Sequence, residues 1–409
     1  MSEVNQSAEP RRAFDPDDLQ SKLSGPALPG ATLGIFGGGQ LGRMMGIAAR
    51  SMGYKVHVLD PDPACPAGYI ADTVVEAGWH DRWAAANLAR ECSAVTLEIE
   101  QVSITSLEEA ARWAPVRPGA TMLAIIQNRV EQKQWLARNG FPVGAFRAAH
   151  SQEELAAAVR DLNGPVFAKS AHGGYDGRGQ AKLGFDGTAV DAAAIAEGWQ
   201  DVGAAQCIVE RALHLEKEIS IMVARSPSGE ICVYPPAENF HENQILSWSV
   251  IPASVSPELA AQAAEIARGI AETFVLEGLL AVEMFVTVGG ELLVNELAPR
   301  PHNSYHGSER ACVTSQFEQA VRAACDLPLG EVSLVQPTAI ANLLGDVWLN
   351  EDGTEREPRF DAALATPTVR LTLYEKLKPR KGRKMGHLSA VGATAEEARE
   401  RVLQAKAAL

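Results

Sequence analysis

Near the start of the chain, short apolar runs alternate with amphipathic stretches. Residues 32–37 (TLGIFG) and 55–60 (KVHVLD) predict β-strands, and 40–53 (QLGRMMGIAARSMG) predicts the helix between them. The run 94–100 (AVTLEIE) predicts a later strand of the same sheet. Because strand–helix–strand crossovers in parallel sheets are right-handed, this opening predicts a doubly wound parallel-sheet α/β domain.

The middle of the chain combines helix signals with hairpin signals. The segment 128–140 (NRVEQKQWLARNG) predicts a helix that its final glycine ends. A Ser-Pro pair starts a helix over 256–274. Glycine-containing turns at 226–229 (SPSG) and 288–290 (VGG) separate apolar runs, so we expect two β-hairpins and mostly antiparallel strands here.

These changes of pattern divide the chain into four parts. We expect a disordered extension over 1–30, an α/β domain over 31–128, an α+β domain over 129–335 and a smaller unit over 336–409. The last unit contains the runs TVRLTLYEK and KLKPRKGRKMGHL.

Composition narrows the class of protein. The 409 residues are 46% hydrophobic and carry a net charge of −14, which disfavours a basic surface for nucleic acid. The most apolar stretch, 274–286, contains two glutamates, so no membrane span is expected. The N-terminus lacks the apolar core of a signal peptide, and six scattered cysteines without a CxxC pair favour neither a zinc site nor disulfides. We therefore expect a cytoplasmic protein without nucleic-acid or membrane partners.

The first glycine loop lies between the first strand and its helix. Gly37, Gly39 and Gly42 follow the spacing GxGxxG, and Asp60 ends the next strand, as in dinucleotide-binding folds. Backbone N–H groups of such a turn can receive a phosphate. The motif alone leaves three readings open: a phosphate site, a nicotinamide cofactor site, or tight packing.

A second glycine loop follows Lys169, which ends an apolar strand. The sequence HGGYDGRGQ over 172–180 can fold its amides over a polyphosphate while the lysine supplies a positive charge. It lacks the Walker A pattern. The alternative is an exposed hairpin tip.

Two glutamates are expected to face each other in the hairpin around 288–290. If Gly289 and Gly290 form a two-residue turn, Glu283 lies directly opposite Glu296. Facing carboxylates in a buried hairpin repel each other unless they share a proton or a cation, and Mg²⁺ bridging them to nucleotide phosphates fits. The alternative is two solvated acids on an exposed ribbon.

Taken together, these loops resemble the ATP-grasp superfamily. The motifs GGGQLGRM, TLEIEQV, NRVEQKQWL, HGGYDGRGQ, VNELAPRPHNS, CVTSQFEQ and GRKMGHL, spread from about Leu33 to the C-terminus, resemble the 5-(carboxyamino)imidazole ribonucleotide synthase family of de novo purine biosynthesis. The resemblance implies a biotin-carboxylase-like N-terminal α/β domain, a central ATP-grasp domain and a small C-terminal domain. It also implies that ATP phosphorylates bicarbonate to carboxyphosphate, whose carboxyl group passes to 5-aminoimidazole ribonucleotide (AIR). The family is usually homodimeric.

The resemblance also implies an ATP site. Its residues are Arg129, Lys169, Gly174, Tyr175, Asp176, Gly177, Arg178, Gly179, Gln180, Glu210, Arg211, Ala212, Leu213, Glu218, His241, Asn295 and Glu296. Glu283 and Glu296 would hold Mg²⁺. His241 could instead be a structural histidine.

The AIR site and the catalytic groups follow in the same way. The implied AIR-binding residues are Gly38, Gly39, Gln40, Leu41, Glu98, Asn303, Ser304, Lys376 and Arg383. The implied catalytic residues are Tyr175, Asp176, Arg178 and Arg300, with Asp176 as the proton acceptor and Arg300 binding bicarbonate or carboxyphosphate. Lys376 and Arg383 could instead belong to a solvated charged hairpin.

Two positions depart from the family pattern. Tyr305 stands where the family commonly has glycine, so we expect either a backbone without a permissive φ or a differently shaped substrate pocket. The segment HENQIL over 241–246 lacks the glycine usual after the histidine.

Three other functions remain to be separated. A formate-dependent glycinamide ribonucleotide transformylase shares the ATP-grasp architecture. A nicotinamide-dependent oxidoreductase would use the first glycine loop but leaves the second loop and the facing glutamates unexplained. The third alternative is a nucleotide-binding regulatory protein without activity.

Overall fold

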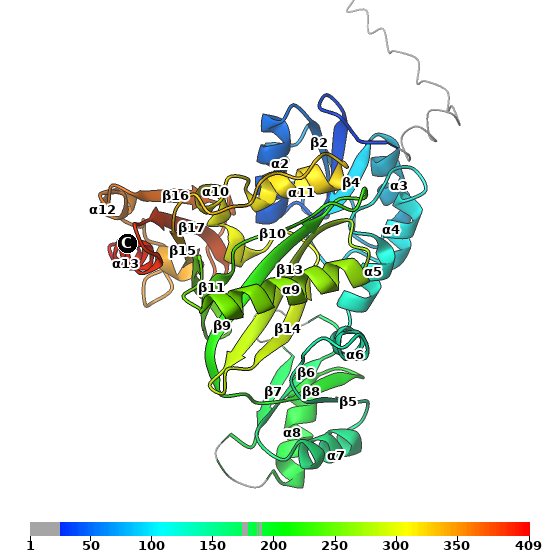
Figure 1. Ribbon diagram of the computed structural model, residues 1–409, viewed down its shortest axis with the longest axis vertical. Coiled ribbons are helices and arrows are strands. Elements are labelled where there is room, and N and C mark those ends of the chain that lie inside the picture. Colours follow the sequence, from blue (N-terminus) through cyan, green and yellow to red (C-terminus); the bar gives the residue numbers. More distant parts are fainter. Residues whose placement is uncertain (1–24, 174–178, 186, 188–189) are drawn as a thin grey trace, which may run out of the picture.

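The computed structural model describes residues 25–173, 179–185, 187 and 190–409. Figure 1 shows an N-terminal α/β part, a large central sheet, a small sheet-and-helix part below it and a C-terminal part to one side. Of the expected extension, residues 1–24 lie outside the described chain. Ala27 is already packed, because its N–H donates to Cys325 O at 2.9 Å and its carbonyl accepts from Tyr54 Oη at 2.6 Å.

The N-terminal part is a parallel sheet with helices on both faces. Its elements are β1 (Thr32–Phe36), α2 (Gln40–Ser51), β2 (Lys55–Asp60), a 3₁₀ helix (Pro66–Tyr69), β3 (Thr73–Glu76), α3 (Arg82–Arg90), β4 (Ala94–Leu97), α4 (Ile104–Ala110) and α5 (Ala120–Ile126). The strand order is β3-β2-β1-β4 and every pairing is parallel. Apolar side chains of α2 pack on one face, and those of α3 and α4 pack on the other. The predicted doubly wound opening is confirmed, although β4 ends at Leu97 rather than at Glu100.

A second, antiparallel sheet lies at the other end of the molecule. Its elements are α6 (Arg129–Arg138), β5 (Phe146–Ala149), α7 (Gln152–Leu162), β6 (Val166–Ser170), β7 (Gln180–Leu183), α8 (Ala192–Val202) and β8 (Cys207–Arg211). The order is β5-β8-β6-β7, and α7 and α8 share a core with this sheet. The predicted helix over 128–140 begins at Arg129, because the Asn128 side chain accepts from the N–H groups of Val130 and Glu131.

The central sheet joins the middle of the chain to the C-terminal part. Its strands are β9 (Leu215–Arg225), β10 (Ile231–Val233), β11 (Ala237–Glu242), β12 (Ile245–Ile251), β13 (Gly278–Thr287), β14 (Leu292–Ala298), β15 (Thr338–Leu344), β16 (Val369–Leu373) and β17 (Lys384–Val391). The order is β14-β13-β9-β11-β12-β15-β17-β16, with β10 on β9. Since β12 pairs with β15, the C-terminal strands extend the central sheet and do not form a separate one.

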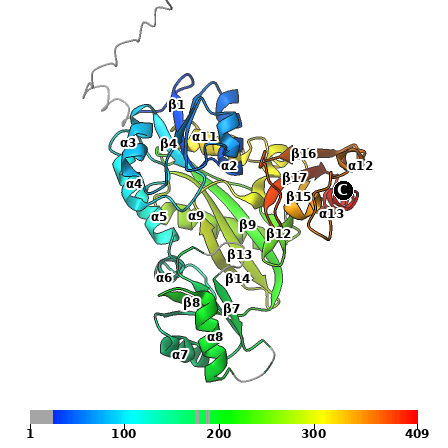
Figure 2. The same ribbon diagram turned by 180° about the vertical axis from the view of Figure 1, so that it is seen from behind.

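Helices cover this sheet and complete the cores. They are α9 (Pro257–Thr273), α10 (Ser308–Ala311), α11 (Gln316–Ala324), α12 (Phe360–Leu364) and α13 (Ala395–Ala407), with 3₁₀ helices Asn303–Tyr305 and Gly345–Trp348. The view from behind in Figure 2 places α11 beside α2, and apolar side chains of both helices belong to one core. The predicted start of α9 is confirmed by the Ser256 side chain, which accepts from Leu259 N–H. Both predicted hairpins are present, β9–β10 and β13–β14.

A buried histidine in the C-terminal part makes stability depend on pH. Burial lowers the pKa of His387 to about 3, and its Nδ1 lies 2.9 Å from Tyr374 Oη. The unfolded chain protonates this ring near pH 6.5, whereas the folded chain keeps it neutral. Its contribution to stability is therefore present above about pH 6.5 and is lost, at about 1.4 kcal/mol per pH unit, as the pH falls toward 3.

Replacing His387 by Gln should flatten the pH dependence of the free energy of unfolding between about pH 6.5 and 5 by about 1.4 kcal/mol per pH unit. Urea denaturation at several pH values measures this slope. His150→Gln, at a largely exposed histidine, is the control for a histidine-to-glutamine change at the surface. An unchanged slope in His387→Gln would show that this ring is not kept neutral.

Candidate active site

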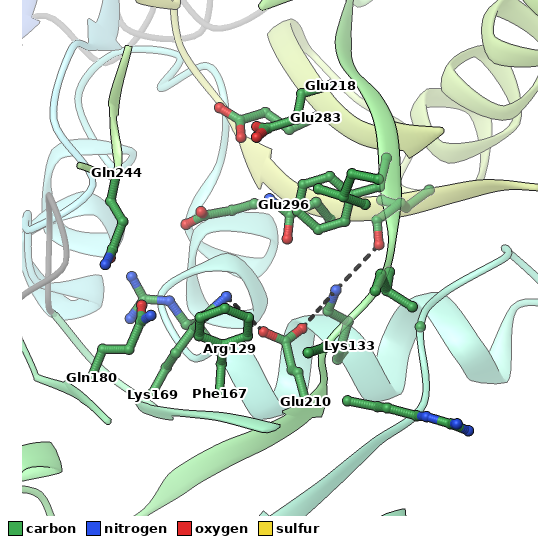
Figure 3. A pocket seen from close by; sticks show the side chains of 18 of the residues that line it. Arg129, Lys133, Phe167, Lys169, Gln180, Glu210, Glu218, Gln244, Glu283 and Glu296 are labelled. Carbon is green, nitrogen blue, oxygen red and sulfur yellow. Dashed lines mark hydrogen bonds and ion pairs between the residues drawn. The ribbon is translucent and has the colours of Figure 1, made fainter. Parts of the chain in front are cut away.

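A pocket of about 470 Å³ opens between the small antiparallel sheet and the central sheet (Figure 3). The small-sheet side is formed by α6, β6, β7 and β8, and the central-sheet side by β9, β13, β14 and the β11–β12 hairpin. The pocket brings together these predicted ATP-site residues: Arg129, Lys169, Gln180, Glu210, Arg211, Ala212, Leu213, Glu218, His241, Asn295 and Glu296, together with Glu283. They come from segments more than 160 residues apart.

The floor of the pocket is a partly buried ion-pair triad. Glu210 accepts from Lys169 Nζ at 2.8 Å with one oxygen and from Lys133 Nζ at 3.0 Å with the other. Lys133 also donates to the carbonyl of Val294 on β14, at 3.2 Å. Burial raises the pKa of Glu210, but the two ammonium groups outweigh it and hold that pKa well below its usual range. The triad keeps Lys169 charged and aimed into the pocket.

Lys133 was not among the sequence-based candidates. It lies one helical turn after Arg129 on α6, so both side chains project from the same face. The spacing i, i+4 from a predicted phosphate-binding arginine is the signal that could have found it.

The facing glutamates are where the hairpin register was expected to put them, although the turn differs. Glu283 pairs with Glu296. The turn, however, is a three-residue loop over 288–290 closed by Thr287 and Glu291, with Gly290 at φ +81°. A β-bulge between Glu283 and Met284 leaves Asn295 as an extra residue on β14, which restores the register. The two-residue turn was wrong, and the bulge compensates for it.

This bulge also shapes the pocket. Neighbouring residues of a regular strand point to opposite faces, but Asn295 and Glu296 both line the pocket. An amide and a carboxylate therefore stand side by side opposite Lys169 and Arg129.

The two carboxylates differ in their surroundings. Burial raises the pKa of Glu283, but the imidazole of His302, with Nε2 3.0 Å from Oε1, lowers it to about 2. The pKa of Glu296 is raised by burial and by the charge of Glu283. In the described part of the chain, no three His, Cys, Asp or Glu side chains converge as a complete metal site. A cation between Glu283 and Glu296 would thus take further ligands from phosphate oxygens or water.

One more pair lines the pocket on the central-sheet side. His241 Nδ1 lies 2.8 Å from Glu218 Oε2, and the two residues are on β11 and β9. Burial lowers the pKa of His241, but the Glu218 carboxylate raises it above its usual value. The ring is thus oriented by a pocket residue and is not buried in an apolar core.

The second glycine loop is only partly described. Gly174, Tyr175, Asp176, Gly177 and Arg178 lie outside the described residues. Gly179, at φ +64°, accepts from Ser170 N–H at 2.9 Å, and Gln180 opens β7 opposite Lys169 on β6.

The first glycine loop is held by two buried carboxylates. Gly38 N–H donates to Asp60 at 2.7 Å, and Glu98 accepts from Gly39 at 2.8 Å and from Gly42 at 3.1 Å. Burial raises the pKa of Asp60 and of Glu98. The amides of Gly38, Gly39 and Gly42 thus donate to carboxylates of the protein itself. Within the predicted turn 38–41, Gln40 and Leu41 are the first residues of α2, and their N–H groups have no acceptor within the helix.

Gly38 also meets a tight contact. A Cβ at this position would lie 2.2 Å from Cys65 Sγ and 2.8 Å from Cys65 Cβ. Gly38→Ala should therefore lower the free energy of unfolding by about 1–3 kcal/mol through overpacking and should distort the turn. Gly78→Ala, at a position with nothing within 4 Å, is the matched control in thermal denaturation. Equal stability of the two variants would contradict the close packing.

The C-terminal part approaches this loop from the other side. Arg43 of α2 forms an ion pair with Glu375 at 3.0 Å, next to Lys376 in the chain. Burial and the positive charge of Arg380 lower the pKa of Arg383, and the nearby carboxylate of Asp62, two residues after β2, offsets this only in part. The predicted AIR residues Lys376 and Arg383 are thus on a loop that contacts the N-terminal domain.

The segment that follows β14 contacts both the N-terminal domain and the pocket. Arg300 pairs with Glu100 at 2.9 Å. Asn303 is buried, and neither atom of its amide finds a partner among the described residues. Ser304 Oγ lies 2.8 Å from both His302 Nδ1 and Ser220 Oγ.

Tyr305 does not face a substrate pocket. It sits in the 3₁₀ helix Asn303–Tyr305 without a positive φ, so a permissive glycine conformation is not required. Its ring is fully buried, and its hydroxyl lies 2.9 Å from the carbonyl of Ser220 and 2.8 Å from that of Pro235. Of the two alternatives expected for this position, the structure has the first: the backbone does without a permissive φ, and the side chain fills the core.

Comparisons with known proteins agree with this geometry. Three family models match: the ribonucleotide synthetase preATP-grasp domain over 30–127, the ATP-grasp domain over 134–317 and the phosphoribosylaminoimidazole carboxylase C-terminal domain over 338–401. The N5-carboxyaminoimidazole ribonucleotide synthase of Bacillus subtilis is 42% identical over 362 residues, which are 88% of this chain and 91% of that protein. The enzyme of the same name from Brucella melitensis is 37% identical over 89% of this chain and 97% of its own length.

Solved structures give the same result. An N5-carboxyaminoimidazole ribonucleotide synthetase in complex with ADP superposes with a TM-score of 0.85 at 39% identity, over 94% of this chain and 98% of that one. The Aspergillus clavatus N5-carboxyaminoimidazole synthase bound to ADP and AIR gives a TM-score of 0.81 at 29% identity, over 92% and 98%. Among the described helices, none is long and apolar enough to cross a membrane.

Proposed function

This chain belongs to the N5-carboxyaminoimidazole ribonucleotide synthase family, and from that premise we propose how its residues share the work of the reaction. It is an ATP-grasp ligase that uses ATP to carboxylate AIR in purine biosynthesis. The single observation that carries the residue assignment is the pocket that joins Lys169, Glu210, Glu283, Asn295 and Glu296.

ATP binds in this pocket, with its adenine against Glu210–Leu213 and its ribose near Glu218 and His241. Arg129 and Lys169 receive the phosphates as fixed positive charges, and Gln180 borders them. Mg²⁺ bound by Glu283, Glu296 and phosphate oxygens would neutralise charge on the transferred phosphoryl group. The neighbouring amide of Asn295 supports that site.

Bicarbonate is the carboxyl source in this proposal. One of its oxygens attacks the γ-phosphorus of ATP, the bond to the β,γ-bridging oxygen breaks, and ADP leaves with carboxyphosphate formed. Carboxyphosphate then releases CO₂ and phosphate, and the exocyclic amine of AIR attacks the carbon of CO₂ and loses one proton to a nearby base. Arg300, held by Glu100, fits the planar anion. Asp176 remains the proposed proton acceptor, and Tyr175 and Arg178 are proposed to orient the amine and the carboxyl donor.

AIR would bind between the N-terminal and C-terminal domains. Gln40 and Leu41 at the start of α2, with Lys376 and Arg383, suit its phosphate. Glu98 accepts hydrogen bonds from the amides of Gly39 and Gly42 in this turn, and it remains the proposed residue for the ribose of AIR. Asn303, with an unpaired buried amide among the described residues, suits the imidazole or the carboxyl group.

The proposal is tested by measuring ADP release from purified protein with Mg-ATP, bicarbonate and AIR, each omitted in turn. ADP release that requires all of them supports it. Dependence on formate and glycinamide ribonucleotide instead would select the transformylase alternative. A homodimer and a cytoplasmic location also belong to the proposal, and light scattering of the purified protein tests the first.

A further inference from the structure

The tip of the β11–β12 hairpin has an unusual backbone. Glu242 pairs with Ile245, so Asn243 and Gln244 form a two-residue turn, and their φ angles are +50° and +67°. Two-residue hairpin turns with positive φ at both positions strongly favour Asn followed by glycine. Asn adopts the left-handed conformation at little cost, because its short polar side chain can form local hydrogen bonds. The longer side chain of Gln244 lacks this advantage.

The side chain of Gln244 extends into the nucleotide pocket. Gln244 is one of the residues that line the pocket, whereas Asn243 is not. Figure 3 shows its amide extending from the hairpin toward the side of the pocket where Gln180 and Lys169 lie. Gln244 is exposed, and among the described residues its amide has no hydrogen-bond partner, so its donors are available to a ligand.

We propose that Gln244 is an additional nucleotide-binding residue that donates a hydrogen bond to a phosphate oxygen of ATP. A side-chain amide carries two N–H donors and suits an anionic oxygen. Glycine, which this turn favours, cannot make such a contact. Strained backbone conformations cluster at functional sites, and of the two residues of this turn Gln244 is the one that lines the pocket. This inference rests on the proposed function only in taking the pocket as the ATP site.

Direct binding measurements with three variants test the contact. Gln244→Gly removes the amide and relaxes the turn, Gln244→Ala removes the amide and keeps the backbone conformation, and Asn243→Gly relaxes the same turn while Gln244 stays. Calorimetric titration with Mg-ATP should give a Kd about tenfold higher for both Gln244 variants, which is about 1.4 kcal/mol. Asn243→Gly should bind like the wild type. Melting temperatures should be equal or higher in the two glycine variants.

The ligand series locates the contact. If Gln244 meets a phosphate, the two Gln244 variants should bind adenosine, titrated at millimolar concentration, as the wild type does. An equal loss for adenosine and ATP would overturn the phosphate assignment, and wild-type ATP affinity in Gln244→Gly would overturn the proposal. These titrations measure binding and do not depend on turnover. A wild type that binds ATP but fails to carboxylate AIR in the separate turnover assay would refute the proposed function and leave this inference standing.

Discussion

Replacing Glu296 by Gln is expected to lower kcat by more than about 100-fold, a larger loss than that from a residue that only orients a metal ligand. The amide keeps the shape of the side chain but removes the negative charge opposite Glu283. Without this charge, Mg²⁺ loses a carboxylate ligand next to the phosphates. The measurement is steady-state ADP release as a function of Mg²⁺ concentration.

The same variant should change the pH dependence of Mg²⁺ binding. The raised pKa of Glu296 means that the metal-free protein takes up a proton at this carboxylate at higher pH than an ordinary glutamate does. Mg²⁺ must displace that proton, so its apparent affinity should fall as the pH decreases toward this raised pKa. Glu296→Gln should abolish this dependence.

Glu291→Gln provides the control. Glu291 is exposed and closes the turn of the same hairpin outside the pocket. It should keep wild-type kcat and Mg²⁺ dependence. If Glu296→Gln retains wild-type turnover and Mg²⁺ dependence, the metal assignment is wrong.

Replacing Lys133 by Met is expected to lower the free energy of unfolding by about 3–5 kcal/mol. Lys133 is only 7% exposed, and its loss leaves the partly buried Glu210 with one cation and the carbonyl of Val294 without this donor. Among the described residues, Lys169 would then be the one ion-pair partner left to Glu210, so less of the positive charge of Lys169 would be available to phosphates. We therefore expect the Kd for ATP to rise as well. Urea denaturation and nucleotide titration measure the two effects.

A second lysine in an ion pair serves as the control, because its replacement shows what the loss of an ion pair outside the pocket costs. Lys217 pairs with Glu238 at 3.1 Å but is 26% exposed and lies outside the pocket. Lys217→Met should cost less stability and leave ATP binding unchanged. Lys133→Arg, which keeps the charge, should recover part of both losses. Equal behaviour of Lys133→Met and Lys217→Met would contradict the role given to the triad.

Local signals in the sequence were enough to predict the main helices and strands. The start of α9 was predictable because Ser256 and Pro257 satisfy the first turn of a helix without help from distant residues. The parallel opening of the N-terminal domain follows from alternating apolar runs, whose faces have to be buried on both sides. Most of the residues that line the pocket were predictable from the family motifs, which mark them although they lie far apart in the sequence.

Contacts between distant segments were not predictable in this way. Lys133 has an ordinary helical position, and only the approach of β8 and β14 makes it a partner of Glu210 and Val294. The pairing of C-terminal and central strands likewise depends on β12 and β15, whose edges are open to any strand of suitable length.

The sequence by itself thus determined the elements, the opposed carboxylates and the family, because caps, turns and apolar periodicity act over a few residues. Only the tertiary structure decided which polar groups already have hydrogen-bond partners within the protein. Asp60 and Glu98 occupy amides that the glycine loop was expected to offer to a phosphate. The turn of the β13–β14 hairpin has three residues instead of two, and the bulge at Asn295 restores the register that places Glu283 opposite Glu296. Both results depend on burial, where each polar group must find a partner and the partner can come from any part of the chain.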